Sequence, residues 1–289
     1  QRVINLANDG PVSTGNLITE NVLRHYGYDP VNGGQAVILF TNAYADITNN
    51  TIEISDNNIG LHLQNFSNNG NMSWSNNNVT VGQDAIGMHA NLFYAPSASL
   101  TINNNTVNAA TGVTGTSDYT WGINIWSVQV GSTVSLTGNT VGSSGGVFGR
   151  GINLWNLPTS NTVTVNGGTV GKSAIGINLD NVDPYFGAGS NTQVNVSNVT
   201  VNSGIGQNGI QARTDVINAV PPAGNVTLNL DKVTVNGGTN AVAVMAPASS
   251  SPFTASLTID NDSELNKTGG QVGTGVLVSG TQASANIKN

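Results

Sequence analysis

The stretch "INNNTV" (102–107) decides the fold, because the chain repeats its pattern along most of its length. The pattern is one apolar residue, four mostly polar residues and a second apolar residue. It recurs as "ITNNTI" (47–52), "LTGNTV" (136–141) and "LDKVTV" (230–235) at steps of 27 to 34 residues, which marks an internal repeat. The first apolar positions of the copies are Leu17, Ile47, Trp74, Ile102, Leu136, Val165, Val196, Leu230 and Ile259.

Each copy lies between two further strand patterns. Alternating apolar and polar residues precede it, as in "SLTI" (99–102), and a glycine-led pattern follows it, as in "GINI" (122–125) and "GINL" (151–154). Three short strands in about 30 residues are typical of one coil of a solenoid. We therefore predict an all-β fold, a single-stranded right-handed parallel β-helix of about nine coils with three short strands per coil. The alternative, a two-sheet sandwich, would show antiparallel strands and no shared frame.

The polar residues of the repeat are expected at the corners of the coils. Asn and Gly tolerate a positive φ, which a tight corner needs. The Thr or Ser before the second apolar residue should stack along one edge of the solenoid. These residues are Thr51, Thr106, Thr140, Thr169, Thr200, Thr234 and Ser263.

The combined pattern "N-N-T-[IV] … G-I-x-L" resembles the right-handed parallel β-helix superfamily. That group includes pectate-lyase-like enzymes, periplasmic copper-handling repeat proteins, phage tailspikes and the passenger domains of autotransporter adhesins. The resemblance covers nearly the whole chain and implies the fold. It implies no single function, because this scaffold carries many activities.

The composition excludes several classes of function. Charged residues make up 8% of the 289 residues and the net charge is −7, so no basic patch favours nucleic acid or an anionic membrane surface. No apolar run approaches the roughly 20 residues of a membrane span. The chain contains no cysteine, which excludes disulfides and thiolate metal sites. We expect no cofactor.

Both ends of the chain carry parts of coils. "RVINLAN" (2–8) resembles "GINLWN" (151–156), so the chain opens late in a coil, and "SANIKN" (284–289) begins another. We expect one domain, 1–289, with incomplete coils at both ends. Two such halves can complete one coil between molecules, so head-to-tail stacking is predicted. The assembly residues would be Val3, Ile4, Leu6 and Ile287. The alternative is a piece trimmed from a longer β-helical protein.

The outward positions of the glycine-led strand form two columns. One is expected to contain Ile38, His62, His89, Asn124, Asn153, Asn178, Gln211, Ala243 and Leu277. The next is expected to contain Phe40, Gln64, Asn91, Trp126, Trp155, Asp180, Arg213, Met245 and Ser279. Flat indoles beside amides suit sugar rings, so Trp126, Trp155, Asn124 and Asn153 are candidate ligand-binding residues. The alternative is that loops cover the two indoles.

Catalytic and metal-binding candidates are few. Asp180, Asp183 and Asp215 follow the same strand in neighbouring coils, with Arg213 between them, and glycan hydrolysis needs two carboxylates. Asp180 and Arg213 can equally form a surface ion pair. His62 and His89 are one coil apart and are the candidate metal ligands, but no third ligand is evident. No motif supports a catalytic set, so an enzyme is not favoured.

We therefore expect a secreted or cell-surface protein with a structural or adhesive role. Its expected partner is a second copy of itself, stacked head-to-tail into a fibre. The alternative is a carbohydrate-binding or carbohydrate-active β-helix of the polysaccharide lyase or hydrolase type.

Overall fold

The structure is a computed structural model of the 289-residue chain, and it describes most of the sequence. The described residues are 4–7, 16–26, 36–41, 45–64, 70–92, 97–117, 119–128, 131–155, 157, 162–180, 190–202, 207–214, 224–246, 253–260, 262–266 and 274–288.

Three parallel sheets, named A, B and C, form the fold, and in the described residues they contain ten, ten and nine strands. Sheet A consists of β1 (Ile4–Ala7), β4 (Ala36–Thr41), β7 (Ile59–Gln64), β10 (Ile86–Leu92), β13 (Trp121–Val128), β16 (Phe148–Trp155), β19 (Ser173–Asp180), β22 (Asn208–Arg213), β25 (Asn240–Met245) and β28 (Val276–Ser279). Sheet B consists of β2 (Leu17–Thr19), β5 (Asp46–Thr48), β8 (Asn71–Ser75), β11 (Ser99–Asn103), β14 (Thr133–Thr137), β17 (Thr162–Asn166), β20 (Ser190–Ser197), β23 (Gly224–Asp231), β26 (Ala255–Asp260) and β29 (Ala283–Ile287). Sheet C consists of β3 (Val22–His25), β6 (Thr51–Ile54), β9 (Asn78–Val81), β12 (Thr106–Ala109), β15 (Thr140–Gly145), β18 (Thr169–Val170), β21 (Thr200–Val201), β24 (Thr234–Asn236) and β27 (Glu264–Asn266).

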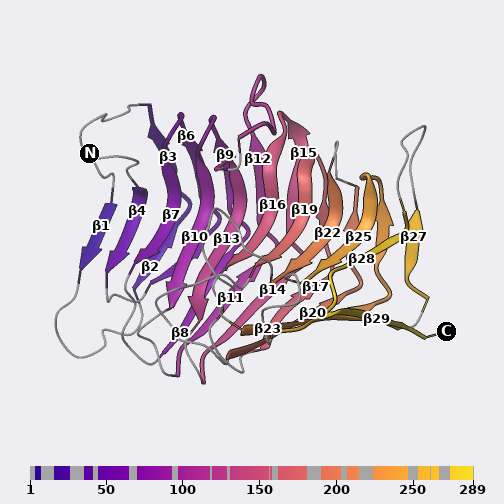
Figure 1. The fold of residues 1–289 in the computed structure, drawn as a ribbon. Coiled ribbons are helices and arrows are strands. Elements are labelled where there is room, and N and C mark those ends of the chain that lie inside the picture. The colour runs from indigo at the N-terminus through magenta and orange to yellow at the C-terminus, as the bar shows by residue number, and fades with distance from the viewer. Residues whose placement is uncertain are drawn as a thin grey trace.

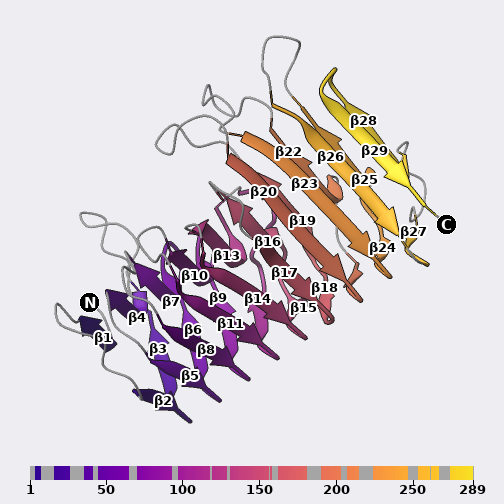
Figure 2. The same cartoon turned by 90° about the horizontal axis from the view of Figure 1, so that it is seen from below.

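The chain visits the sheets in the fixed order A, B, C, so each coil adds one strand to each sheet. Figures 1 and 2 show the coils stacked along one axis, with β1 at one end and β28 and β29 at the other. One hydrophobic cluster runs through the interior, from Leu23 in β3 to Ile259 in β26. The predicted parallel β-helix with three strands per coil is therefore confirmed.

The corner between sheets B and C explains the "N-N-T" frame. The first Asn of the frame has a positive φ, as at Asn49 (φ 56) and Asn104 (φ 53). The second Asn is buried and links coils: the backbone N and side-chain Nδ2 of Asn77 both donate to Oδ1 of Asn105, at 2.9 Å. The same bonds join each neighbouring pair in the series Asn21, Asn50, Asn77, Asn105 and Asn139. We call this series the corner ladder, and it satisfies buried polar groups that would otherwise be costly.

The third position of the frame forms the predicted column of hydroxyls along sheet C. Thr106 pairs with Thr140, and the pairing continues through Thr169, Thr200 and Thr234. Two ends of this column differ from the expectation. Thr51 pairs with Asn78, and Thr234 pairs with Glu264 where Ser263 was expected, because that copy has one extra residue.

The first coils are shifted by one residue from the predicted register. Ile18 pairs with Ile47, so Ile18 and not Leu17 holds the core position of the first copy. In sheet A, Leu39 pairs with His62, and Thr41 pairs with Gln64. The expected placement of Ile38 and Phe40 in the outward columns was therefore wrong. The reason is that Ala36 pairs with Ile59. The "AVIL" segment therefore begins one residue before the position of the glycine in the glycine-led pattern.

The glycine of the glycine-led pattern, such as Gly122 in β13, is required by close packing in the inner coils and not by its φ. A Cβ on Gly122 would lie 2.5 Å from Cγ1 of Val141 in sheet C and 2.6 Å from the carbonyl oxygen of Gly151. The positive-φ glycines lie elsewhere, among them Gly138 and Gly167 at the corner between sheets B and C. The expectation that this corner glycine supplies a positive φ is therefore corrected: it allows sheets A and C to approach each other.

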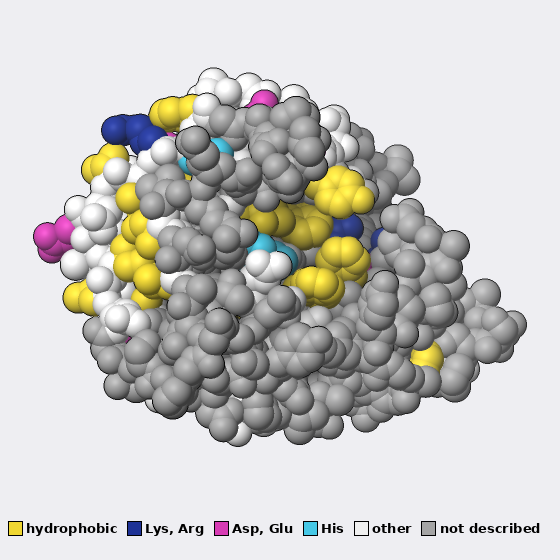
Figure 3. Space-filling view, turned by 90° about the vertical axis from the view of Figure 1, so that its left-hand side faces the viewer, with side chains coloured by type: hydrophobic (Ala, Val, Ile, Leu, Met, Phe, Trp, Pro, Cys, Tyr) yellow, Lys and Arg dark blue, Asp and Glu magenta, His cyan; other side chains and the backbone are white. Residues whose placement is uncertain are grey.

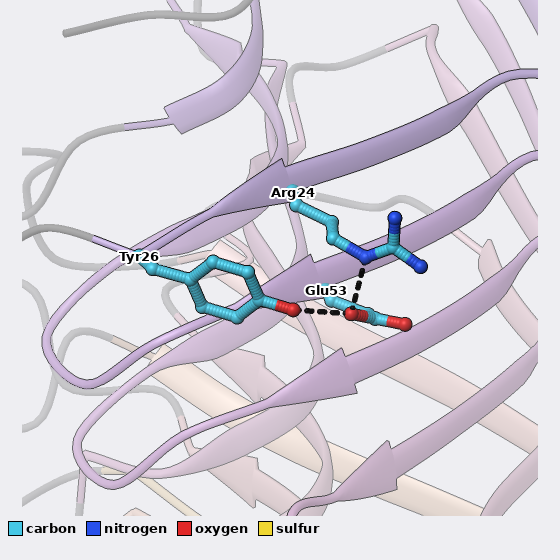
Figure 4. A network of polar contacts seen from close by, with 3 residues as sticks. All are labelled: Arg24, Tyr26 and Glu53. Atoms are coloured by element: carbon cyan, nitrogen blue, oxygen red, sulfur yellow. Dashed lines mark hydrogen bonds and ion pairs between the residues drawn. The ribbon is translucent and has the colours of Figure 1, made fainter.

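A small polar network joins β3, the residue that follows it and β6 at the edge of sheet C (Figure 4). Arg24 pairs across the strands with Glu53, and its Nε lies 2.8 Å from Oε2 of that carboxylate. The hydroxyl of Tyr26 donates to the same oxygen. The hydrogen bonds from Tyr26 and then Arg24 lower the pKa of Glu53. All three side chains are solvent-accessible, so the network contributes little to stability.

Candidate functional site

A column of buried polar side chains on the outer side of sheet A forms the candidate site. Register pairs place His62, His89, Asn124, Asn153, Asn178 and Gln211 side by side on six successive strands. Asn124, Asn153 and Asn178 have no exposed surface, and His89 and Gln211 are also buried. Buried amides on the outer face of a sheet are unusual and need hydrogen-bond partners.

The partners are the side chains of the neighbouring coils. Asn153 donates from Nδ2 to Oδ1 of Asn124 at 2.7 Å, and Asn178 donates to Asn153 at 2.8 Å. Gln211 donates to Asn178 at 3.0 Å, and Asn208 donates to Gln211 at 2.7 Å. We call His89, Asn124, Asn153, Asn178 and Gln211, with Asn208 beside Gln211, the amide ladder. From Asn124 to Gln211, each amide donates to the next strand toward the N-terminal end of the solenoid, so this series has a single direction, whereas Asn208 donates to Gln211 within β22.

His89 ends the amide ladder as an acceptor. Nδ2 of Asn124 lies 2.7 Å from Nδ1 of His89, so Nδ1 carries no proton and the neutral ring holds its proton on Nε2. Burial, and next the charge of His62, lower the pKa of His89 to about 3. The two rings meet edge to face with their centroids 4.7 Å apart.

The histidine pair does not gain a third metal ligand. Within the described ranges, no group of three His, Cys, Asp or Glu side chains could hold a metal ion. Nδ1 of His89 is also already engaged with Asn124. The structure thus places His62 and His89 on neighbouring strands, as the spacing predicted. Their rings contact each other, and His89 also contacts the amide of Asn124.

The two outer tryptophans lie beside the amide ladder. Trp126 and Trp155 are register partners on β13 and β16, and both are half-buried. Trp126 contacts the ring of His89, with centroids 6.3 Å apart. The Nε1 atoms of both indoles are buried and have no acceptor among the described residues. A buried donor without an acceptor costs about 1–3 kcal/mol, so a water or a ligand oxygen is the expected partner.

Two residues that the sequence interpretation missed complete this cluster. Trp121 meets the ring of Trp155 edge to face at 5.9 Å, and the guanidinium carbon of Arg150 lies 5.8 Å from the centre of the Trp121 ring. Trp121 and Arg150 are register partners just before the frame glycines. An alignment of the residues that directly precede the glycine in each copy would have placed Trp121 beside Arg150. We call Trp121, Trp126, Arg150 and Trp155 the aromatic cluster.

The amides of Asn124 and Asn153 are engaged within the protein. Oδ1 of Asn153 accepts from both Asn178 and Arg150, the latter at 2.9 Å. Both side chains are fully buried. In the described structure their side chains form the hydrogen bonds of the amide ladder, in the column next to the two indoles. The two buried indole N–H donors have no hydrogen-bond partner among the described residues, and the ring of Tyr119, which lies 6.1 Å from that of Trp121, is exposed.

The candidate catalytic residues are only partly described. Asp180 and Arg213 are register partners on β19 and β22, and Asp180 is buried. Asp183 and Asp215 lie outside the described residues. Asp180 is therefore the one carboxylate of the three that the described structure places, and it lies beside a cation.

The candidate assembly residues lie on the edge strands. Ile4 and Leu6 on β1 are partly buried against the core, and Ile287 on β29 is 61% exposed. Val3 lies outside the described residues. Figure 3 shows the end of the solenoid that carries β1, where hydrophobic side chains reach the surface close to histidine and basic side chains.

Comparison with protein-family models, curated proteins and solved structures found no match to the chain. The fold and the geometry above are therefore the observations on which a function can be argued. In the described residues, no helix has the length and hydropathy of a membrane span.

Proposed function

We propose that the protein is an extracellular structural or adhesive rod that extends by head-to-tail stacking of its coils. The observation that carries the proposal is that apolar residues stand in inward columns at both edges of all three sheets, although His25 occupies one inward position of β3. The β1, β2 and β3 edges carry Ile4, Leu6, Ile18 and Leu23 at these positions. The opposite edges carry Leu265, Val276, Val278 and Ile287.

These edge residues form complementary rows. Following the registers through each sheet, Val276 and Val278 hold the columns of Ile4 and Leu6, Ile287 holds that of Ile18, and Leu265 holds that of Leu23. A second copy stacked in the same register would place an apolar residue next to an apolar residue in each of these columns. Unpaired strand edges offer backbone donors and acceptors for the same contact.

The proposal is tested by sedimentation and electron microscopy of the chain against an edge variant. Ile287→Asp places a charge on the β29 edge, whereas Tyr119→Asp changes a side chain of similar exposure away from the edge strands. Stacking predicts rods that lengthen with concentration in the unmodified chain and in Tyr119→Asp, but not in Ile287→Asp. An unmodified chain that stays a 29.6 kDa monomer at high concentration would contradict the proposal.

The aromatic cluster favours carbohydrate binding as a second candidate function. The supporting observation is the pair of buried indole N–H groups of Trp126 and Trp155, which have no acceptor among the described residues. Sugar hydroxyls accept such bonds while their C–H faces pack on aromatic rings. The test is glycan binding by the chain and by the Trp126→Ala/Trp155→Ala variant. Binding that is absent, or that survives the double change, would contradict a glycan site here, while rod formation should be unaffected.

A further inference from the structure

The outer face of sheet B between β8 and β20 differs from every other part of the surface described above. Each described outward side chain on these five strands is an uncharged Ser, Thr, Asn or Gln, and none is buried. In a protein of net charge −7 this is a neutral, hydrogen-bonding face. Its residues are Asn71, Ser73, Ser75, Ser99, Thr101, Asn103, Thr133, Ser135, Thr137, Thr164, Asn166, Gln193, Asn195 and Ser197.

The side chains of this face form a two-dimensional lattice. One row runs along the solenoid through Ser73, Thr101, Ser135, Thr164 and Asn195, each paired with the next in register. A parallel row two residues further along each strand runs from Ser75 to Ser197. Strand geometry sets the repeat at about 4.8 Å along the rows and about 6.6 Å between them.

The lattice is rigid, and part of it is unsatisfied within the protein. Each strand from β11 to β17 is hydrogen-bonded to a parallel neighbour on both sides, which fixes the Cβ positions. The β-branched side chains of Thr101 and Thr164 have few rotamers. Their hydroxyls make no hydrogen bond in the described structure, so both are available to a ligand.

The chemistry of the face excludes the common macromolecular partners. Its described residues include no Lys or Arg for nucleic acid. They include no apolar side chain that a protein partner could bury at the core of an interface. They also include no aromatic ring on which a sugar could stack. What remains is an ordered ligand that is uncharged, donates and accepts hydrogen bonds, and repeats in two dimensions.

We propose that the outer face of β8, β11, β14, β17 and β20 binds the surface of ice. Water in ice donates and accepts as a hydroxyl does, and ordinary hexagonal ice repeats along its axes at distances near the two repeats of this face. One hydroxyl gains little, because it exchanges one water for another. A preorganised array makes many such bonds, although the protein loses its translational and rotational freedom only once on binding. Rigidity and regular spacing of the side chains therefore increase the affinity.

The test is ice-crystal shaping and inhibition of ice recrystallisation by the purified full chain. Thr101→Tyr and Thr164→Tyr place large rings in the row on either side of Ser135, and we expect both to abolish the effect on ice. The matched control is Thr140→Tyr, which changes a half-exposed threonine on the outer side of sheet C and should retain the effect. Far-UV circular dichroism checks that all three variants keep the β fold.

The outcomes separate clearly. An unmodified chain that neither shapes ice nor slows recrystallisation overturns the proposal, as does an effect that Thr101→Tyr and Thr140→Tyr reduce equally. Binding to crystalline cellulose or chitin without an effect on ice also overturns it, and assigns the face to a polysaccharide. Because this face is separate from the strand edges, sedimentation of the same samples reports on head-to-tail stacking independently.

Discussion

Nδ2 of Asn124 donates to Nδ1 of His89 across 2.7 Å, and this contact fixes the protonation state of the histidine. A protonated ring would present Nδ1–H to the amide donor. To accept that proton, Asn124 would have to turn its oxygen toward the ring, and Asn153 and Asn178 would have to turn after it. The proton on His89 is therefore coupled to the orientation of the whole ladder.

The first prediction concerns stability at acidic pH. The pKa of His89 is about 3 in the folded chain and about 6.5 in the unfolded chain, so the unfolded state binds more protons between these values. The free energy of unfolding should fall as the pH drops through this window, by on the order of 3 kcal/mol between pH 7 and 4. Urea unfolding across this range measures the effect. His89→Gln should show a smaller fall, and equal falls in both proteins would contradict the assignment.

The second prediction concerns the corner ladder. Asn77→Ala removes the acceptor of the buried backbone N of Asn50, and this unpaired group should cost about 1–3 kcal/mol, whereas Nδ2 of Asn50 keeps the carbonyl oxygens of Ile18 and Thr48. The neighbouring Asn76→Gly is the control, because Asn76 has a φ of 56 that glycine adopts freely. Thermal unfolding should separate the two variants widely. Similar melting temperatures would mean that the ladder contributes little.

The third prediction concerns the glycine of the glycine-led pattern in sheet A. A Cβ on Gly151 would lie 2.7 Å from the carbonyl oxygen of Gly176 and 2.5 Å from Cγ1 of Val170, so Gly151→Ala should destabilise the fold by about 1–3 kcal/mol. Gly275 holds the same place in its repeat but has no atom within 4 Å of an added Cβ. Gly275→Ala should therefore have no measurable cost in denaturant unfolding. A cost shared by both would show that backbone freedom, and not packing, selects glycine.

The fourth prediction separates the structural and binding roles of Trp155. Trp155→Phe keeps an aromatic edge against Trp121 but removes the buried N–H that has no acceptor among the described residues. Its stability should be equal to or above that of the unmodified chain, since an unpaired buried donor is unfavourable. If the indole N–H binds a sugar hydroxyl, glycan affinity should nevertheless fall. Calorimetric titration and thermal unfolding of the same samples measure both quantities.

Most of the fold could be predicted because one repeat encodes it many times. The Thr column and the pairing of Trp126 with Trp155 follow directly from aligning the copies. Single-residue shifts at Ile18, Leu39 and Glu264 could not be predicted, because the outer copies carry an added or displaced residue that alternation alone does not locate.

The candidate site was harder to predict than the scaffold. Alternation places Asn124 and Asn153 on the outer face but does not reveal that this face is buried there. The direction of the amide ladder depends on which atom of each amide faces its neighbour, which residue spacing does not contain. Trp121 and Arg150 lie side by side because they are on neighbouring strands of two stacked coils. The contact between the guanidinium group and the indole ring depends on side-chain conformation.

The common direction of the amide ladder also has an electrostatic consequence. Each side-chain amide is a small dipole, and aligned dipoles add, as they do along a helix axis. Asn124, Asn153 and Asn178 all point their N–H ends toward His89, so the positive pole of the series faces that ring. The field of the ladder therefore acts against a positive charge on His89, in the same sense as burial.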